Sequence, residues 1–380
     1  VYTVGVTVRG DEQRLVRRCR SAAIVQDKPY PIPRIAPPQT RPVIVGFGPA
    51  GMFAALLLAR AGANPIVLER GPDAQTRSAQ IAAFRAGGPF DPECNVQFGE
   101  GGAGTFSDGK LNTGTHDARI GFVLAEFAAH GAPEHITYDA KPHIGTDVLV
   151  EVVQSLRREV IARGGEVRFG HRVTGLSTEG GRITALTVHS PEGDYTLPAR
   201  QVILAIGHSA RDTFEILHAQ GVPMEPKPFS MGVRIEHRQS DINTAQYGAA
   251  AERLPAADYS LSCHLPDGSS AYTFCMCPGG EVFAAASEQG GVCTNGMSSS
   301  RRDGENANAA VLVTLHPEDF PDKSTLGGMY WQRSIEQRAY ACGGGNYHAP
   351  AQRVGDFLAG RASTAPGRVQ PTYRPGVTWC

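Results

Sequence analysis

The glycines between residues 46 and 51 have the type and spacing of a turn that binds a dinucleotide. Gly46, Gly48 and Gly51 follow the apolar run Val43–Val45 with GxGxxG spacing, and residues 52–61 are rich in alanine and leucine with no helix breaker. Such glycines permit a tight turn, close approach of the backbone to a pyrophosphate, and close helix–strand packing. The free N–H groups at the helix start would hold the diphosphate. The turn residues predicted to bind the cofactor are Gly46, Gly48, Pro49, Ala50 and Gly51.

The segment after this helix completes a βαβ unit. Gly62 ends the predicted helix, and residues 65–68 form a second apolar strand that finishes in Glu69. A carboxylate in this position can accept hydrogen bonds from both hydroxyls of an adenosine ribose. Glu69 is followed by Arg70 and Gly71, an ending typical of two-dinucleotide-fold flavoproteins. The alternative is a glycine-rich turn in an unrelated α/β protein, but the complete unit favours FAD, with Glu69 and Arg70 among its contacts.

A second glycine-rich stretch runs from Gly99 to Gly109 and contains five glycines. Such a loop can bring backbone N–H groups within hydrogen-bonding distance of a ligand. Phe98, Phe106 and Leu111 would anchor it, which favours a loop over the flavin and its diphosphate rather than a flexible surface loop. Its predicted cofactor contacts are Gly101, Gly102, Ala103, Gly104, Thr105, Ser107, Asp108, Lys110 and Leu111.

Two thiols and one imidazole are candidates for groups near the flavin ring. Cys275 and Cys277 lie on the same face of a predicted strand. Three interpretations stay open for them: a redox pair acting with the flavin, a metal site with Cys263, His264 or Cys293, or packing thiols. No second spaced cysteine pair supports a metal, and we predict none. His208 follows the apolar strand Gln201–Gly207. The candidate catalytic residues are His208, Cys275 and Cys277.

The elements that must position these residues predict an α/β protein. We expect a Rossmann-like FAD-binding domain over residues 41–221 and an inserted antiparallel β-sheet substrate domain over residues 222–326. A helical return segment is expected over residues 327–380. The strand Val167–Val173 would present backbone groups to the adenine, and the strand Gln201–Gly207 has the ending at which many flavoproteins leave the nucleotide domain. Further cofactor contacts are therefore predicted at Val173, Ala205 and Gly207.

Shorter patterns complete the expected secondary structure. Residues 146–163 have apolar residues at helical spacing. Residues 173–200 alternate and turn as an antiparallel meander, and residues 136–138 resemble a strand. Residues 328–341 and 351–358 are expected to be helices.

Residues 1–40 form a separate N-terminal segment. Val4 to Val8 alternates as a strand, and Asp11 would cap a short helix through Cys19. Arginines in this helix form either a nucleic-acid patch or a solvated face, and the lack of interleaved aromatic residues favours the solvated face. The prolines from Pro29 to Pro38 form a stiff linker.

Composition excludes several classes of partner. The 380 residues carry a formal net charge of −1, so no global field attracts nucleic acid or an anionic membrane. No apolar run reaches the ~20 residues that span a bilayer. Eight cysteines are scattered through the chain, which indicates reduced thiols and a cytoplasmic protein. The chain lacks an initiator Met and ends without a closing helix, so we expect a fragment of a longer protein.

Several motifs give the chain a family resemblance. They are Gly46–Gly51 (GFGPAG), Glu69–Gly71 (ERG), Glu100–Leu111 (EGGAGTFSDGKL), Lys141–Asp147 (KPHIGTD), Phe274–Gly280 (FCMCPGG), Thr294–Ser298 (TNGMS) and Tyr347–Gln352 (YHAPAQ). With them, the chain resembles a bacterial family of uncharacterised FAD-dependent dehydrogenases. The resemblance implies FAD in a glutathione-reductase-like fold with an inserted substrate domain, and it implies no particular substrate. Family members also carry a C-terminal glycine-rich turn and helix that return to the flavin, which this chain lacks.

Two functions from different classes follow. The first is an FAD-dependent oxidoreductase that acts on a small substrate by hydride transfer through flavin N5. No second βαβ nucleotide unit is visible, so NAD(P)H, if used, binds transiently. The second is a flavin-binding protein whose FAD is structural or redox-sensing, without turnover, because no catalytic acid–base pair is evident. An RNA-binding flavoprotein is a third hypothesis, disfavoured by the near-neutral charge.

Overall fold

A parallel four-stranded sheet forms the nucleotide-binding half of the molecule. The computed structural model describes residues 4–24, 30–266 and 268–380. Strand β1 (Val43–Val45) pairs in parallel with β2 (Ile66–Glu69) and β7 (Val202–Leu204), and β2 pairs with β3 (Glu166–Phe169). The resulting strand order is β3-β2-β1-β7. Helix α2 (Pro49–Ala61) joins β1 to β2, so the predicted βαβ unit is confirmed.

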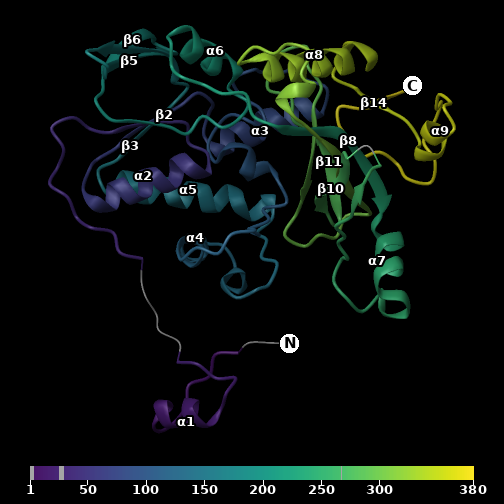
Figure 1. The fold of residues 1–380 in the computed structure, drawn as a ribbon, viewed down its shortest axis with the longest axis horizontal. Helices are drawn as coiled ribbons and strands as arrows, with labels where there is room; N and C mark the ends of the chain where they lie inside the picture. The colour runs from purple at the N-terminus through teal and green to yellow at the C-terminus, as the bar shows by residue number, and fades with distance from the viewer. Residues whose placement is uncertain (1–3, 25–29, 267) are drawn as a thin grey trace.

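Helices α2 and α5 (Thr146–Ala162) lie side by side against this sheet and form its largest core (Figure 1). The core includes Ile44, Leu56 and Val152, none of which is exposed to solvent. Full burial of each such side chain contributes about 1.5–3 kcal/mol, so the apolar spacing of the two helices determines how they pack. Helix α2 ends at Gly62 in the left-handed conformation, as the sequence predicts.

Strand β7 is more exposed than we expect from the apolar run that predicts it. Its residues Ile203 and Leu204 are 39% and 43% exposed. Within the described residues β7 pairs with β1 alone, so it is the open edge of the parallel sheet. An apolar run of this kind is compatible with burial but does not require it, because the covering element decides exposure.

An antiparallel meander connects β3 to the edge strand, as predicted for residues 173–200. Its strands are β4 (Arg172–Glu179), β5 (Arg182–Ser190) and β6 (Gly193–Pro198). The single strand predicted over residues 167–173 is wrong, because Gly170 adopts a positive φ of 73° and separates β3 from β4.

A second, antiparallel sheet has the strand order β8-β13-β10-β9. It confirms the sheet predicted within residues 222–326, while the domain boundaries themselves stay predictions. Strands β11 and β12 form a separate hairpin-like pair beside it. The strand bounds are β8 (Phe229–Arg238), β9 (Ser262–His264), β10 (Ser270–Cys277), β11 (Gly280–Ala284), β12 (Thr294–Ser298) and β13 (Asn306–Leu315).

The C-terminal residues return to the nucleotide-binding half through α8 (Gly327–Cys342), which confirms the helix predicted there. Figure 1 shows α8 beside α6 (Arg211–Ala219) at the top of the molecule. The helix predicted over residues 351–358 is shorter, because Ala351 belongs to β14 (Ala349–Ala351) and pairs with Trp379 of β15. The remaining bounds are α3 (Ala74–Arg85), α4 (Arg119–Ala129), α7 (Gln239–Tyr247), α9 (Val354–Leu358) and β15 (Val377–Trp379).

Residues 4–24 stand apart from the body of the molecule (Figure 1), whereas Tyr30 packs on Phe122 and Ile35 donates a backbone hydrogen bond to Ala61. Helix α1 (Glu12–Arg18) is capped by Asp11 as predicted, and none of its residues is buried. The strand predicted over residues 4–8 is wrong, because Val4 and Val6 are 73% exposed and no neighbouring strand pairs with them in the described chain. Pro29 of the predicted linker lies outside the described residues, and residues 30–40 have no helix or strand.

Two further findings concern local structure. The strand predicted over residues 136–138 is wrong, because this segment belongs to a 3-10 turn, Glu134–Thr137. In the portion of the chain that the structure describes, no helix has both the length and the apolar character needed to cross a bilayer.

Candidate functional site

The turn between β1 and α2 is built from backbone, with no room for side chains at two glycines. Gly46 has a φ of 98°, and a Cβ atom there would lie 2.4 Å from the carbonyl oxygen of Ala205. A Cβ atom at Gly51 would lie 2.0 Å from the carbonyl oxygen of Gly46. Gly48 is the N-cap of α2, and no side chain caps the helix. The turn therefore presents its uncapped helix start to a ligand, which fits the predicted diphosphate contact.

Glu69 is buried at the end of β2 and binds three backbone N–H groups. Its Oε2 accepts a hydrogen bond from Phe47 at 2.7 Å, and its Oε1 accepts from Gly71 at 2.9 Å and from Gly99 at 3.0 Å. A carboxylate has about four acceptor positions, so one remains for a ribose hydroxyl. Glu69 thus joins the turn between β1 and α2 (residues 46–51, the dinucleotide turn) to the glycine-rich stretch of residues 99–109 (the glycine loop). Its ribose contact stays a prediction.

Arg70 lies in a cluster of two arginines and two carboxylates. It donates to Glu93 at 2.7 Å and to Asp212 at 2.8 Å, and Arg172 donates to the same two carboxylates. Its guanidinium also lies 4.1 Å from the ring centre of Phe98. Hydrogen bonds and charge from Arg70 lower the pKa of Asp212, against the opposing effect of burial. The two arginines balance the charge of the two carboxylates. The ion pairs that Arg70 makes with Glu93 and Asp212 hold the end of β2 in place.

The glycine loop is ordered and packs directly on the dinucleotide turn. Gly101 donates its N–H to the carbonyl of Phe47 at 2.9 Å, and residues 102–106 form a 3-10 turn. A Cβ atom at Gly48 would lie 3.7 Å from the Cα of Gly102, so the two glycine segments face each other at backbone distance. Phe98 and Phe106 are buried, which confirms their predicted role as anchors.

The polar side chains of the loop are engaged within the protein. Thr105 donates to the carbonyl of Glu100 at 3.2 Å, and Ser107 donates to that of Gly104 at 2.7 Å. Asp108 is 1% exposed and forms ion pairs with Lys110, at 2.8 Å, and with Arg302. Direct cofactor contact by these side chains stays a prediction. Ala103 and Gly104 are half-buried within the 3-10 turn, and Leu111 packs against the main core.

A buried arginine and a buried carboxylate beneath the loop were not predicted. Arg77 is fully buried, donates to the carbonyls of Asn95 and Glu100, and has one unpartnered nitrogen, Nη2. Burial lowers its pKa to about 10. Glu100 is also fully buried, and burial raises its pKa. Arg77 and Glu100 therefore hold the loop from below, and the only sequence signal was a charged residue, Glu100, between Gly99 and Gly101.

The strand-end residues lie next to the dinucleotide turn. Ala205 donates its N–H to Val45 at 2.8 Å, and its carbonyl faces Gly46. Gly207 has a φ of 70°, and His208 is exposed with its Nε2 3.1 Å from the hydroxyl of Ser209. No hydrogen bond or ion pair joins His208 to either candidate cysteine among the described residues. Val173 is buried in β4 within the second core.

The candidate cysteines lie at the end of β10, where the glycine loop reaches the antiparallel sheet. Lys110 donates from its Nζ to the carbonyl of Met276. Cys277 is fully buried, and its thiol donates to the carbonyl of Cys275 at 3.3 Å. The two thiols therefore lie beside the last residues of the loop whose first residues cover the dinucleotide turn.

Arg234 and Asn308 complete this group and were not predicted. Arg234 of β8 donates to the side-chain oxygen of Asn308 in β13 and, at 3.4 Å, to the carbonyl of Cys275. Asn308 is fully buried, and its Nδ2 has no partner. Alternation of charged or amide residues with apolar ones along β8 and β13 was the available signal. The alternation alone does not show that these side chains are neighbours, because that depends on the order of the strands in the sheet.

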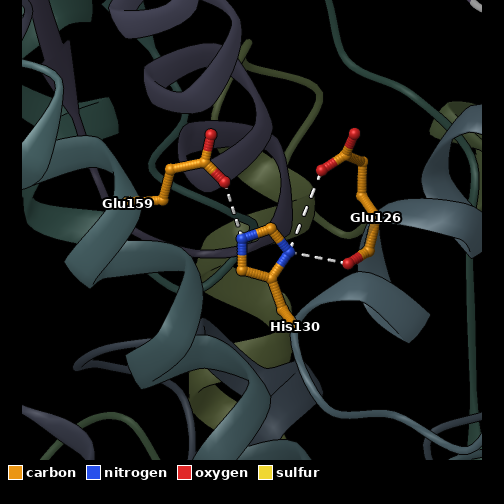
Figure 2. A group of neighbouring side chains, drawn as sticks. All are labelled: Glu126, His130 and Glu159. Atoms are coloured by element: carbon orange, nitrogen blue, oxygen red, sulfur yellow. Dashed lines mark hydrogen bonds and ion pairs between the residues drawn. The ribbon is translucent and has the colours of Figure 1, made fainter.

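A group of metal-ligating type lies elsewhere, between α2, α4 and α5 (Figure 2). His130 contacts Glu159 at 2.9 Å through Nε2 and the carbonyl of Glu126 at 2.7 Å through Nδ1. Arg60 forms ion pairs with Glu126 at 2.6 Å and with Glu159 at 2.8 Å. Arg163 also pairs with Glu159, at 2.6 Å, so the two arginines together balance the two carboxylates, and the group serves to join three helices.

Two family models match the chain. The model described as "FAD binding domain" matches residues 39–88, which hold the βαβ unit. The model described as "FAD-dependent protein, C-terminal domain-like" matches residues 228–380. The tight glycine turn fits an FAD diphosphate, because a side chain at Gly46 or Gly51 would occupy space closed by backbone. The chain is an FAD-binding flavoprotein, as the sequence predicts.

Particular relatives extend this picture. An "Uncharacterized protein" of Clostridium beijerinckii is 49% identical over 341 residues, covering 89% of this chain and 63% of that protein. The chain thus spans less than two thirds of the relative. Solved structures include anhydrotetracycline hydroxylase OxyS from Streptomyces rimosus (19% identity, 73% of this chain, 46% of that chain, TM-score 0.35). Another is glycerol-3-phosphate dehydrogenase from Bacillus halodurans complexed with FAD (11% identity, 78% and 52%, TM-score 0.37).

Proposed function

We propose that this chain carries the cofactor site of an FAD-dependent oxidoreductase acting on a small substrate. One observation supports it above others: a single loop joins the dinucleotide turn to a polar, cation-rich group on the antiparallel sheet. Gly101 and Gly102 contact the turn at one end, and Lys110 contacts the strand of Cys275 at the other. A flavin held at the turn would therefore extend towards this group of side chains.

The residues divide into two roles under this proposal. Backbone groups of the turn and the loop hold FAD, and Glu69 fixes the two segments relative to each other. Bound FAD supplies hydride transfer at its ring nitrogen N5. Arg234 and Lys110 give the opposite side of the site a positive charge, which favours a substrate with an anionic or electron-rich group.

The finer assignments are part of the same proposal. The antiparallel meander inserted between β3 and β7 supports a glutathione-reductase-like subtype. NAD(P)H, if used, would bind transiently at the protein surface. The free cysteines, four of them exposed, support a reducing, cytoplasmic environment.

The test is a visible absorption spectrum of the purified chain, followed by chromatography of the cofactor that heat releases. We expect a flavin spectrum and released FAD. Candidate substrates, including anionic ones, are then added without oxygen. Loss of the oxidised flavin absorbance would support turnover, whereas FAD that no substrate or hydride donor reduces would favour a structural or redox-sensing flavin.

The matched variants are Gly46→Val and Gly121→Ala. A side chain at Gly46 would meet the carbonyl of Ala205, whereas a Cβ atom at Gly121 has no neighbour within 4 Å. Gly46→Val should lose FAD, and Gly121→Ala should retain it. Equal FAD content in both variants would show that the cofactor does not bind at this turn.

A further inference from the structure

The backbone around Cys275 is irregular within an otherwise regular strand. The pairing of β10 with β13 shifts register between Phe274 and Cys277, which marks a β-bulge. Cys275 has a φ of 46°, a left-handed conformation that is uncommon for a residue with a side chain. Such conformations are strained and concentrate at functional sites. The bulge re-aims the Cys275 side chain relative to a flat strand.

The two thiols are in contact and have different environments. Cys277 is fully buried, whereas Cys275 is only half-buried. The hydrogen bond from the Cys277 thiol, and then the charges of Lys110 and Arg234, lower the pKa of Cys275 to about 6. The same contact and burial raise the pKa of Cys277. One thiol is thus suited to attack as a thiolate, and its neighbour is suited to form the second half of a disulfide.

The charges around Cys275 favour a negative sulfur. Lys110 and Arg302 share one carboxylate, that of Asp108. Arg234 has no carboxylate within ion-pair distance among the residues that the structure describes, and its donors go to neutral oxygens. Three cations, Lys110, Arg234 and Arg302, are therefore accompanied by the single carboxylate of Asp108. A thiolate at Cys275 adds a second negative charge and reduces this imbalance. The unpartnered Nδ2 of buried Asn308 is a further donor in the group.

Cys293, elsewhere in the same half of the molecule, provides a contrast. Its side chain packs with the core that contains Phe283 and Met297. Burial raises its pKa to about 11. The environment of Cys275 is therefore specific to the bulge and is not shared by thiols of this region in general.

We propose that Cys275 and Cys277 form a redox-active dithiol that exchanges two electrons with FAD. In oxidation, an S–S bond forms and the two sulfurs lose two electrons and two protons. FAD takes up two electrons and two protons in the same reaction. The flavin half of this proposal rests on the proposed function, whereas the dithiol half concerns only the chain. Lys110 links the two, because its loop also contacts the dinucleotide turn.

The first experiment measures the thiols without FAD. The full-length chain is treated with limiting iodoacetamide at pH 7, and labelling of each cysteine is measured by peptide mass spectrometry. Cys275 should react at least about 10-fold faster than Cys293, because a larger fraction is thiolate. Lys110→Met should slow it several-fold, whereas Lys141→Met, which removes an exposed pair with Asp258, should not. Equal rates at Cys275 and Cys293 would overturn the proposal.

The pH profile of the labelling adds a second criterion. The charged and titratable groups facing Cys275 are Cys277, Lys110, Arg234 and Asp108, and Arg302 pairs with Asp108 behind them. The labelling rate of wild-type Cys275 should rise with pH and reach half of its maximum near pH 6. Cys277→Ser should move this midpoint to higher pH. A midpoint that stays near pH 9 in the wild type would contradict the environment described above.

The second experiment measures how many electrons each chain takes up. The FAD-loaded chain is oxidised with diamide, freed of reagent, and titrated with dithionite without oxygen. Wild type should take up two electrons more per chain than Cys275→Ser or Cys277→Ser. Cys342→Ser is the control, because the thiol of Cys342 lies beside that of Cys380 and could form an unrelated disulfide. Equal uptake by wild type and Cys275→Ser would overturn the dithiol.

The outcomes separate the two proposals. If a substrate reduces the flavin but wild type and Cys275→Ser take up equal numbers of electrons, the oxidoreductase remains and the dithiol exchange fails. If the extra electrons are found but no substrate or hydride donor reduces FAD, the dithiol remains and the proposed small-molecule reaction fails.

Discussion

The two ends of the glycine loop make sites of opposite construction. At Gly101 and Gly102 the loop contacts the dinucleotide turn through backbone atoms, and the carboxylate of Glu69 accepts hydrogen bonds from the backbone of both segments. At Asp108 and Lys110 the loop contacts the antiparallel sheet through charged side chains. The first construction binds a cofactor by shape and backbone dipoles, whereas the second sets charge for reaction or substrate binding.

The largest expected effect is at the backbone end. Gly51→Val places a side chain where a Cβ atom would already lie 2.0 Å from the carbonyl of Gly46. Because the obstacle is backbone, β1 and α2 must separate. We expect loss of FAD and destabilisation of about 3 kcal/mol or more. FAD content and urea unfolding measure both effects, and a variant that retains FAD with an unchanged midpoint would break the comparison.

The next effect is at the charged end. Asp108→Asn leaves Lys110 and Arg302 without a carboxylate, and Asp108 is 1% exposed. Removing one partner of a buried ion pair costs about 3 kcal/mol. Urea unfolding should show this loss, while FAD content at saturating cofactor stays close to wild type. Asp117→Asn, which removes the exposed pair with Arg119, is the control and should leave the urea midpoint close to that of wild type.

A smaller effect on stability is expected at Arg60, which joins three helices away from both ends of the glycine loop. The Arg60 side chain is 20% exposed, so Arg60→Met should destabilise by about 2 kcal/mol at pH 7. Hydrogen bonds from Arg60 lower the pKa of Glu159 to about 2. This contribution is complete above the unfolded value near pH 4.5 and disappears as the pH falls towards 2.

The pH dependence gives the measurement for Arg60. Unfolding of wild type and Arg60→Met is compared at pH 7 and at the lowest pH where wild type still folds. The difference between the two proteins should shrink at low pH. A difference that is constant or grows on acidification would show that the Glu159 carboxylate does not carry the interaction.

The smallest effect concerns α1. None of its residues is buried. Deleting residues 1–24 should therefore change the stability of the rest of the chain by less than about 0.5 kcal/mol. A thermal unfolding midpoint that falls by several degrees would show that this segment contributes to the folded core.

The backbone-built part of the site was the part that the sequence could predict. The glycines at 46, 48 and 51 and the strand ending in Glu69 are local signals, and each depends on a few consecutive residues. The group of Arg234, Asn308 and Cys275 depends instead on the strand order β8-β13-β10, which joins residues far apart in the chain. No local pattern contains this pairing.

Two of the wrong predictions have the same cause. Val4 to Val8 alternates like a strand, but alternation alone forms no sheet without a partner. Ala351 has a helix-forming side chain, yet its pairing with Trp379 places it in β14. In both cases the contact that decides the structure comes from outside the local sequence.

The open edge at β7 has a practical consequence. In the part of the chain that the structure describes, no strand pairs with the outer side of β7, and this side, with the half-exposed Ile203 and Leu204, forms a template for a strand from another molecule. Solutions of the chain should therefore self-associate as concentration rises, and the oligomers would add strands to the parallel sheet. Charged substitutions at these two positions are a direct way to keep the protein dispersed for spectroscopy.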